Sequence, residues 1–334
     1  MTKVALLGPV AWRTPPLHYG PWEQVTSLLA EGLVARGIDV TLFATLDSIT
    51  KGTLDGVCAR GYADDPTVDG RLSEAMHVAH ALARSGEFDL VHNHLDWLPL
   101  AFSEHCRAPL LTTIHGFSGA GILPAYRHAK SAYVSISDAD RSPELEYVAT
   151  VYHGVDATSL PFQQVAGPGL VCFGRIHPDK GTHAAIEIAR LAGRPLTICG
   201  IVQDQRYFDE LVAPHIDGQM VSYLGSVGPQ RRGEILGGSA ALLHPIEFAE
   251  PFGLSVVEAM TCGTPVVAYP RGSMSEVIDE NVTGLLVQTV EEAAEAVDRI
   301  ELIDRAGCRA RARERFSAER MVDDYMSVYT RILA

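Results

Sequence analysis

Two glutamates, Glu250 and Glu258, lie eight residues apart where a buried strand is expected to give way to a helix. The apolar residues 241–243 precede them as a short predicted strand, and Pro251 and Gly253 are typical of a tight turn before a helix. The first N–H groups of a helix lack intrahelical acceptors, so its N-terminus attracts anions and hydroxyl oxygens. Carboxylates beside it can accept hydrogen bonds from sugar hydroxyls. The spacing therefore indicates a site for a phosphorylated polyol.

A purely structural interpretation of the second glutamate also exists. Ser255 and Glu258 have the spacing of a capping box, in which the glutamate returns a hydrogen bond to the first N–H of its own helix. The whole segment favours the functional interpretation. It reads Glu250-Pro-Phe-Gly-Leu and continues Glu258-Ala-Met-x-x-Gly263-Thr-Pro265-Val-Val-Ala. This resembles the Glu-x7-Glu motif of the retaining family 4 glycosyltransferases, also called glycosyl transferases group 1, and the resemblance runs through nearly the entire chain.

An arginine and a lysine follow a predicted strand in the second half of the chain. Arg175 comes directly after Gly174, and Lys180 lies five residues further on, before a predicted helix. A guanidinium can fork across two phosphate oxygens, while an ammonium supplies a mobile point charge. Both side chains could equally be ordinary loop cations. The resemblance implies that Arg175 and Lys180 hold a diphosphate and stabilise negative charge on the leaving group.

Histidines end two predicted strands of the first half. His115 follows an apolar strand, and the resemblance implies that its side chain contacts the donor sugar. His92, His94 and Asp96 form an H-x-H-x-D run, which is a pattern of metal ligands. No fourth ligand is evident and the resembled family needs no metal, so we expect no metal cofactor. These side chains are instead expected to line an acceptor pocket.

The loop at residues 8–20 connects the first predicted strand to a helix. Members of the resembled family usually carry two adjacent glycines here, near the donor diphosphate. In this chain the second position is Pro21, which has no N–H for a phosphate, so the carried-over contact is limited to Gly20. Exposed loop residues and acceptor contacts look identical in sequence, and the candidates for such contacts are Trp12, Arg13 and His18.

The resemblance completes the expected site. The nucleotide base is expected to lie against the loops at Gly200 and Val227, and Glu258 is expected to bind the ribose hydroxyls. The predicted catalytic residues are Glu250, Arg175, Lys180 and His115. The predicted donor-binding residues are Gly20, Gly174, Gly200, Val227, Phe252, Gly253, Leu254 and Glu258. The predicted acceptor-binding residues are Trp12, Arg13, His18 and His94.

Alternating strands and helices must position these residues. In the first half, amphipathic stretches at 22–36 and 72–84 predict helices, and they separate apolar strands as a parallel sheet requires. The turn-rich residues 157–169 predict a linker, after which a second series of strands begins. The predicted fold class is α/β, with two Rossmann-like doubly wound domains that the resemblance places across a cleft in the GT-B arrangement. The predicted domains are an acceptor-binding domain (1–155), a nucleotide-sugar-binding domain (156–315) and a C-terminal helix crossing back to the first domain (316–334).

Size and charge limit the possible functions. The chain has 334 residues, is 47% hydrophobic and carries a formal net charge of −14, which is enough apolar content for two cores. Both halves are acidic, which argues against nucleic acid and against strong attachment to anionic membranes. No signal peptide or long apolar run is evident, so a cytoplasmic location is expected.

Two further patterns have structural explanations. Six cysteines are scattered without C-x-x-C spacing, which is typical of small buried side chains and not of disulfides or metal ligands. The arginine-rich residues 305–320 are interleaved with acidic residues at helical spacing, and they are expected to form a solvated helix face.

The predicted activity is transfer, with retained configuration, of a hexosyl unit from a nucleotide diphosphate sugar to a small soluble hydroxyl acceptor, without a metal. Family frequency favours a UDP-hexose over GDP-mannose as the donor. One alternative is a sugar-nucleotide epimerase or hydrolase of the same fold. The other is a non-catalytic protein that binds nucleotide sugars.

Overall fold

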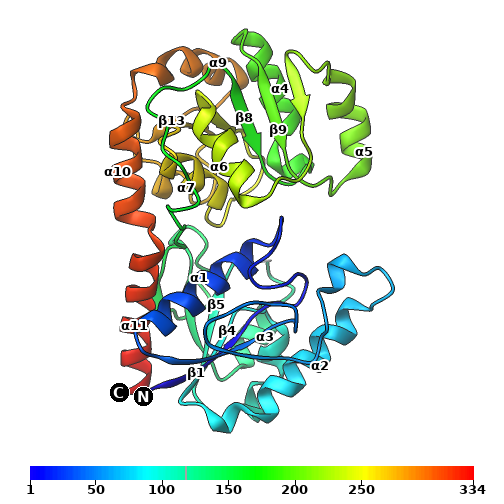
Figure 1. Ribbon diagram of the computed structural model, residues 1–334, viewed down its shortest axis with the longest axis vertical. Coiled ribbons are helices and arrows are strands. Elements are labelled where there is room, and N and C mark those ends of the chain that lie inside the picture. The colour runs from blue at the N-terminus through cyan, green and yellow to red at the C-terminus, as the bar shows by residue number, and fades with distance from the viewer. Residues whose placement is uncertain (117–118) are drawn as a thin grey trace. The chain divides into compact units, whose positions relative to one another are not determined.

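The computed structural model describes residues 1–116 and 119–334, and it divides the chain into two compact units (Figure 1). The first unit comprises Met1–Gly154 and Ala318–Ala334, and the second comprises Val155–Ser317. Each unit contains a parallel sheet with helices packed on it. The predicted fold class, α/β with two Rossmann-like doubly wound domains, is confirmed.

The described part of the first unit forms a seven-stranded sheet in the order β3-β2-β1-β4-β5-β6-β7, with every pair parallel. Its strands are β1 (Lys3–Leu7), β2 (Asp39–Phe43), β3 (Thr53–Asp55), β4 (Leu90–Asn93), β5 (Leu110–Ile114), β6 (Ala132–Ser135) and β7 (Ala149–Thr150). The strand order reverses between β1 and β4. Ligands of open parallel sheets bind beyond the carboxyl ends of the strands at such a reversal. The loops after β1 and β4 therefore form the expected binding edge of this unit.

Helices of the first unit follow the predicted pattern. They are α1 (Pro21–Ala35), α2 (Gly70–Ala83), α3 (Leu123–His128) and α11 (Ala318–Leu333), with the 3-10 turns η1 (Tyr62–Asp64), η2 (Ser85–Glu87) and η3 (Leu98–His105). The C-terminal helix α11 packs on α1 (Figure 1). A Cβ on Gly32 would lie 2.4 Å from a methyl carbon of Val322, so only glycine permits this approach. Arg36 and Asp323 add an ion pair of 2.7 Å.

The described part of the second unit forms a six-stranded parallel sheet in the order β10-β9-β8-β11-β12-β13. Its strands are β8 (Leu170–Phe173), β9 (Leu196–Cys199), β10 (Val221–Tyr223), β11 (Ala241–His244), β12 (Val266–Ala268) and β13 (Gly284–Leu286). The order reverses between β8 and β11, so the loops after these two strands form its expected binding edge.

Most helices of the second unit cover this sheet. They are α4 (Thr182–Leu191), α5 (Gln205–Tyr207), α6 (Pro229–Gly238), α7 (Leu254–Thr261), α8 (Met274–Val277), α9 (Val290–Arg299) and α10 (Arg305–Phe316). Shorter turns are η4 (Pro178–Lys180), the π-helical η5 (Phe208–Val212), η6 (Ala213–His215) and η7 (Ile300–Leu302). Gly181 and Gly253 precede α4 and α7 in the left-handed region, with φ values of 65° and 87°, which favours glycine at both positions.

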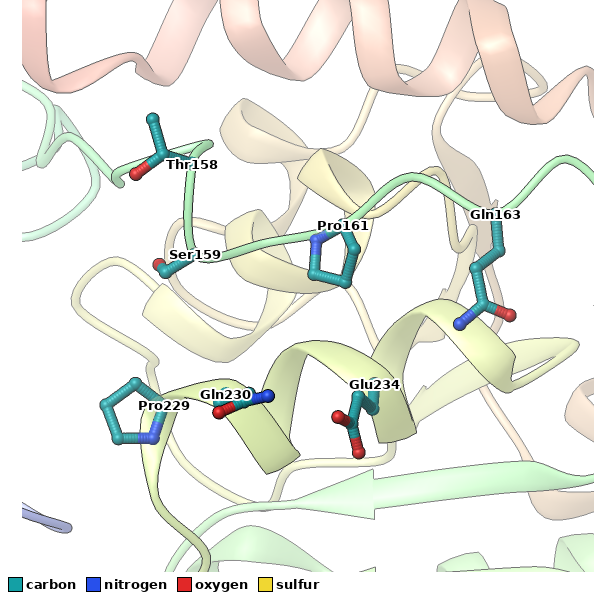
Figure 2. Close-up of a pocket in the computed structure, with 7 residues that line it drawn as sticks. All are labelled: Thr158, Ser159, Pro161, Gln163, Pro229, Gln230 and Glu234. Atoms are coloured by element: carbon teal, nitrogen blue, oxygen red, sulfur yellow. The ribbon is translucent and has the colours of Figure 1, made fainter.

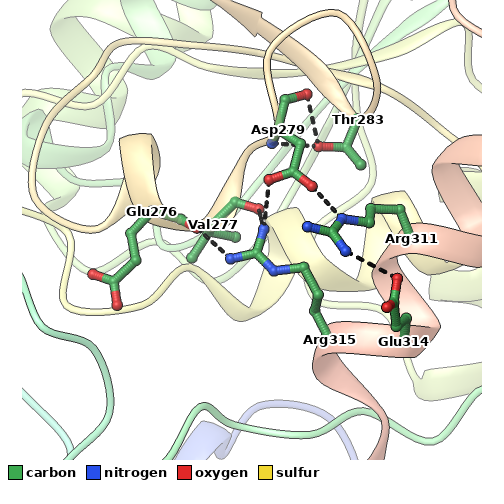
Figure 3. A network of polar contacts seen from close by, with 7 residues as sticks. All are labelled: Glu276, Val277, Asp279, Thr283, Arg311, Glu314 and Arg315. Carbon is green, nitrogen blue, oxygen red and sulfur yellow. Dashed lines mark hydrogen bonds and ion pairs between the residues drawn. The ribbon is translucent and has the colours of Figure 1, made fainter.

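The prediction that the arginine-rich stretch forms a solvated helix face is wrong for Arg305 and Arg315, although Arg311 pairs with the exposed Glu314 at helical spacing. Arg311 and Arg315 on α10 both pair with the Asp279 carboxylate, and Arg315 Nη2 donates to the Glu276 carbonyl at 2.6 Å (Figure 3). Arg305, at the start of the helix, donates to the carbonyls of three other residues. These arginines therefore fix α10 to its own unit. Sequence spacing could not show this, because the acceptors lie far away along the chain.

Within residues 1–116 and 119–334, no helix is both long and apolar enough to cross a membrane. All six cysteines are free thiols, four of them buried and Cys58 and Cys106 half-buried.

Candidate active site

Three loops meet closely at the binding edge of the second sheet. Gly200 follows β9 with a φ of 149°, and a Cβ there would lie only 1.7 Å from the Gly174 carbonyl oxygen after β8. The Gly200 N–H donates to the Gly225 carbonyl at 2.9 Å, which joins the loop after β10. The structure thus brings together the predicted residues Gly174 and Gly200. Val227 lies two residues beyond Gly225 and is half-buried.

Lys180 and Glu250 form an ion pair at this edge. Lys180 ends the turn η4 after β8, and Glu250 lies in the loop after β11. The distance from Lys180 Nζ to Glu250 Oε2 is 2.5 Å, and the two side chains are only 16% and 10% exposed. His244, the last residue of β11, places Nε2 3.4 Å from the same oxygen. The Lys180 ammonium also lies 4.5 Å from the centre of the Phe248 ring.

Glu250 is strongly biased toward its ionised form. Burial acts to raise the pKa of this carboxyl, but the neighbouring His244 and the charge of Lys180 outweigh it and lower the pKa to about 2. Burial in turn lowers the pKa of His244, and the Glu250 carboxylate partly offsets that shift. At neutral pH the site therefore holds a buried anion whose oxygens can accept hydrogen bonds.

The backbone around Glu250 is held by close packing. A Cβ on Gly272 would lie 2.3 Å from the Glu250 carbonyl oxygen, and the Ser273 N–H donates to that oxygen at 2.8 Å. Gly253 is the N-cap residue of α7 and has no side chain, so no cap side chain binds the first N–H groups of the helix, which include that of Leu254. Phe252 is 2% exposed and its ring packs on Phe316. At Phe252, Gly253 and Leu254 the groups predicted to bind the nucleotide sugar are therefore backbone N–H groups.

Glu258 is paired with a residue that the sequence reasoning missed. Arg232 Nη1 lies 2.8 Å from Glu258 Oε1, and the two side chains are 19% and 14% exposed. The Arg232 guanidinium also lies 5.2 Å from the centre of the Phe173 ring. The capping-box interpretation is wrong, because Gly253, and not Ser255, occupies the N-cap position of α7. The sequence feature that could have pointed to Arg232 is its place as a basic residue in the first turn of α6, a helix that begins with Pro229.

Arg175 lies directly after Gly174 at the carboxyl end of β8. Its guanidinium contacts the side-chain oxygen of Gln203, a neutral amide. In the described part of the chain no carboxylate forms an ion pair with Arg175, so its charge remains available to an anion.

The loop after β1 surrounds a buried acid in the first unit. Gly20 is the N-cap residue of α1, and a Cβ there would lie 2.8 Å from Pro16 and 3.0 Å from the Glu23 carboxyl. Glu23 is 2% exposed and accepts a hydrogen bond from the Trp12 N–H at 3.3 Å. Burial raises the pKa of Glu23 to about 7. Three predicted acceptor contacts differ in exposure: His18 is exposed, whereas Trp12 and Arg13 are half-buried.

The predicted histidines are packed against one another. His115 is 8% exposed, its Nε2 lies 2.9 Å from His94 Nδ1, and its Nδ1 lies 3.2 Å from His153 Nε2. The Trp22 ring stacks on the His115 ring, with their centroids 5.3 Å apart. His94 has no exposed surface, which contradicts its predicted contact with an acceptor. The reason is that His94 directly follows β4, and its ring is enclosed between those of His92 and His115. His153 was not singled out from sequence.

The remaining part of the H-x-H-x-D run also has protein partners. Asp96 has a φ of 46°, which is uncommon for a residue other than glycine, and its carboxylate accepts a hydrogen bond from the Tyr126 hydroxyl at 2.5 Å. Among residues 1–116 and 119–334, no group of three or more histidines, cysteines or acids is arranged to hold a metal ion.

A surface hollow of about 640 Å³ lies elsewhere in the second unit (Figure 2). It is bordered by the linker before β8 and by the exposed side of α6. Its lining residues are Thr158, Ser159, Pro161, Gln163, Pro229, Gln230 and Glu234. None of the predicted site residues lines it, so the candidate site is the edge of the sheet and not this hollow.

Known proteins resemble both units. Residues 166–318 match the family model described as Glycosyl transferases group 1, and residues 23–158 match the model of Glycosyltransferase Family 4. A glycogen synthase of Mycobacterium tuberculosis is 26% identical over 95% of this chain and 90% of its own length. A D-inositol 3-phosphate glycosyltransferase of Pseudarthrobacter chlorophenolicus is 28% identical over 86% of this chain and 85% of its own.

Solved structures show the same fold. AviGT4, a glycosyltransferase involved in avilamycin A biosynthesis, superposes with a TM-score of 0.78 at 23% identity, over 100% of this chain and 98% of its own. Anabaena Alr3699/HepE, in complex with UDP and glucose, superposes with a TM-score of 0.75 at 20% identity, over 99% of both chains. The two family models, the relatives and the shared fold agree. The chain therefore belongs to the family 4 glycosyltransferases, the glycosyl transferases group 1, and is a glycosyltransferase with the GT-B fold.

Proposed function

We propose that this glycosyltransferase moves a hexosyl unit from a UDP-sugar to a small soluble hydroxyl acceptor, with retention of configuration and without a metal. The observation that carries the proposal is the buried contact of Lys180 with Glu250 at the reversal point of the second sheet. A cation and an ionised carboxylate at one point suit a ligand that combines phosphates with hydroxyls.

The proposed reaction breaks the bond between the anomeric carbon and the diphosphate oxygen. The electron pair leaves with the diphosphate, and the protein helps by stabilising the charge that develops there. Arg175, whose guanidinium has a neutral amide as its contact, and Lys180 supply positive charge. Because these two side chains serve the leaving group, the proposal needs no metal.

The acceptor oxygen then bonds to the anomeric carbon on the same face. Because the new bond forms on the face that the diphosphate leaves, the configuration is retained. The leaving phosphate oxygen takes the acceptor's proton, so no protein nucleophile or base is required. In this scheme Glu250 accepts hydrogen bonds from the sugar hydroxyls, and the N–H groups at Phe252, Gly253 and Leu254 donate to the donor. Glu258 binds the ribose hydroxyls, which requires it to exchange or share its contact with Arg232.

The donor and the acceptor are proposed to use different units. The donor is assigned to the loops after β8, β9 and β11, with Gly174, Gly200 and Val227 near the nucleotide. The acceptor is assigned to the loop after β1, where Trp12, Arg13 and His18 have exposed or half-buried side chains. The similar Anabaena structure is a complex with UDP and glucose, and this similarity supports a UDP-sugar as the donor.

A screen of nucleotide sugars tests the proposal. UDP-glucose, UDP-N-acetylglucosamine, GDP-mannose and ADP-glucose would each be added in a thermal-shift assay, because a ligand that binds the native state raises the melting temperature. We expect the largest shift with a UDP-sugar. Incubation of that donor with candidate acceptors should then yield a product with the donor's anomeric configuration, observed by NMR. A product that forms equally without any acceptor would favour the epimerase or hydrolase alternative.

A further inference from the structure

Four histidines of the first unit form a continuous chain of ring contacts. His92 Nδ1 lies 3.3 Å from His94 Nε2. His94 Nδ1 lies 2.9 Å from His115 Nε2, and His115 Nδ1 lies 3.2 Å from His153 Nε2. The four rings are between 0% and 8% exposed. Every contact therefore joins the Nδ1 atom of one buried ring to the Nε2 atom of the next.

Hydroxyl groups hold the first ring of this histidine chain. The Tyr329 hydroxyl lies 2.8 Å from His92 Nδ1, and Thr113 Oγ1 lies 2.8 Å from His92 Nε2. Thr113 Oγ1 lies 2.8 Å from the Tyr325 hydroxyl. Both tyrosines belong to α11, so the C-terminal helix is hydrogen-bonded to β4 through His92 and to β5 through Thr113.

The contacts couple the tautomers of the rings. Burial lowers the pKa of all four histidines, that of His115 to about 3, so the rings are neutral at pH 7. A neutral imidazole has one N–H and one lone pair. Two N–H groups or two lone pairs facing each other at 2.9 Å would repel. Because each contact joins Nδ1 to Nε2, all linked rings must carry the proton on Nδ1, or all on Nε2.

We propose that His94 is a positioning residue that sets the tautomer of His115, and that Tyr329 and Thr113 act on the same chain through His92. The tautomer decides what His115 offers to a sugar. His115 Nδ1 faces His153 Nε2 at 3.2 Å, so a sugar hydroxyl reaches this atom only by replacing His153 as its partner. With the proton on Nε2, His115 Nδ1 then accepts a hydrogen bond from that hydroxyl, whereas with the proton on Nδ1 it donates one. The catalytic relevance rests on the proposed glycosyl transfer, but the coupling of the tautomers does not.

NMR of histidine-labelled protein tests the coupling without any ligand. In protein containing ¹⁵N-histidine, the nitrogen shifts and long-range N–H couplings report the tautomer of each of the 13 histidines. Single substitutions of His92, His94, His115 and His153 would assign their signals. We expect these four rings to share one tautomer at pH 7. Opposite tautomers at His94 and His115, or a protonated ring in the chain, would overturn the proposal.

Substitutions at Tyr329 and His94 test whether these residues control the tautomer of His115. Tyr329→Phe removes one hydroxyl next to His92, and His94→Asn keeps a polar group near the former Nδ1 position while it removes the contact with His92. Both should shift the ratio of the two tautomers at His115. Tyr133→Phe is a matched control, because this buried hydroxyl of the same unit donates to the Tyr126 carbonyl outside the chain. An unchanged ratio at His115 in both test variants would contradict the positioning role.

Steady-state kinetics test whether His94 affects catalysis. The donor is UDP-glucose or the nucleotide sugar that gives the largest thermal shift. His94→Leu should lower kcat by about 10-fold to 100-fold through misplacement of His115, with KM nearly unchanged, and His94→Asn should recover part of the loss. A rise in KM with unchanged kcat would overturn the positioning role. If His94→Leu does not fold, kcat and KM are measured for Tyr329→Phe and His94→Asn instead. If the wild-type protein turned over no nucleotide sugar, the proposed function would be refuted. The coupling of the histidine tautomers measured by NMR would not be affected.

Discussion

Replacement of Lys180 by methionine tests the electrostatics of the site most directly. In Lys180→Met the Glu250 carboxyl stays buried but loses the ammonium 2.5 Å away. The pKa of Glu250 is about 2, compared with an ordinary value of 4.5, and such a difference corresponds to about 3 kcal/mol. Lys180 accounts for part of this shift and His244 for another part. We therefore expect the variant to lose about 1 to 3 kcal/mol of unfolding free energy at pH 7.

The pH dependence of this loss has a defined sign. Because the pKa of Glu250 is lower in the folded protein, its ionised form stabilises the fold fully above pH 4.5, and this contribution is lost as the pH falls toward 2. The wild type should therefore lose more stability over this window than Glu250→Gln, which has no group to protonate. Lys180→Met should fall between the two.

A double-mutant cycle separates the pair from its surroundings. Urea unfolding, followed by circular dichroism, would be measured for the wild type, Lys180→Met, Glu250→Gln and the double variant. We expect a coupling free energy of about 1 to 3 kcal/mol between the two sites. The control cycle uses Lys130 and Glu104, which form an ion pair of similar length, 2.7 Å, but are 72% and 64% exposed and should be nearly additive. Additive effects at Lys180 and Glu250 would refute the reasoning.

Three further predictions concern other residues of the site. Burial raises the pKa of Glu23 to about 7, so ionisation destabilises the fold increasingly between pH 4.5 and 7. Glu23→Gln should then be more stable than the wild type by about 3 kcal/mol at pH 8 and by far less at pH 4, and thermal melts showing an equal difference at both pH values would contradict this. Glu258→Gln should weaken binding of the nucleotide sugar in calorimetry, while Glu250→Gln should mainly lower kcat; equal and negligible effects would disprove both assignments. Gly200→Ala should cost at least about 2 kcal/mol, because its Cβ would lie 1.7 Å from the Gly174 carbonyl, and it should abolish the donor-induced thermal shift. A normal unfolding curve for Gly200→Ala would show that the loops can separate without loss of the fold.

Regular secondary structure could be predicted from the sequence where the pattern was long. The helix expected at residues 22–36 is α1 (Pro21–Ala35), and the strands of both sheet centres were identified as apolar runs. The short edge strands β3, β7 and β13 were missed. None of these three strands contains a pair of valines such as that of the equally short β12 (Val266–Ala268), so their pairing with a neighbour defines them.

Candidate residues were easier to find than their partners. Glu250, Lys180 and Arg175 were identified because they stand next to strand ends and turn residues, which are local features. The partner of Glu258 was missed because Arg232 lies 26 residues away. His94 was assigned to an acceptor pocket, yet the fold buries it completely between other histidines.

Sequence by itself determined the alternation of strands and helices, the motif from Glu250 to Glu258 and the family that this motif resembles, since all of these are written in residues close along the chain. Tertiary structure alone decided the order of the strands, the contact of Lys180 with Glu250 and the histidine chain that ends on Tyr329. The physical reason is that these features join residues that are not neighbours in the chain: Lys180 and Glu250 are 70 positions apart, and His92 and Tyr329 are 237 positions apart. Hydrophobic period and turn chemistry specify local geometry, whereas burial and hydrogen bonding between distant groups depend on how the elements pack.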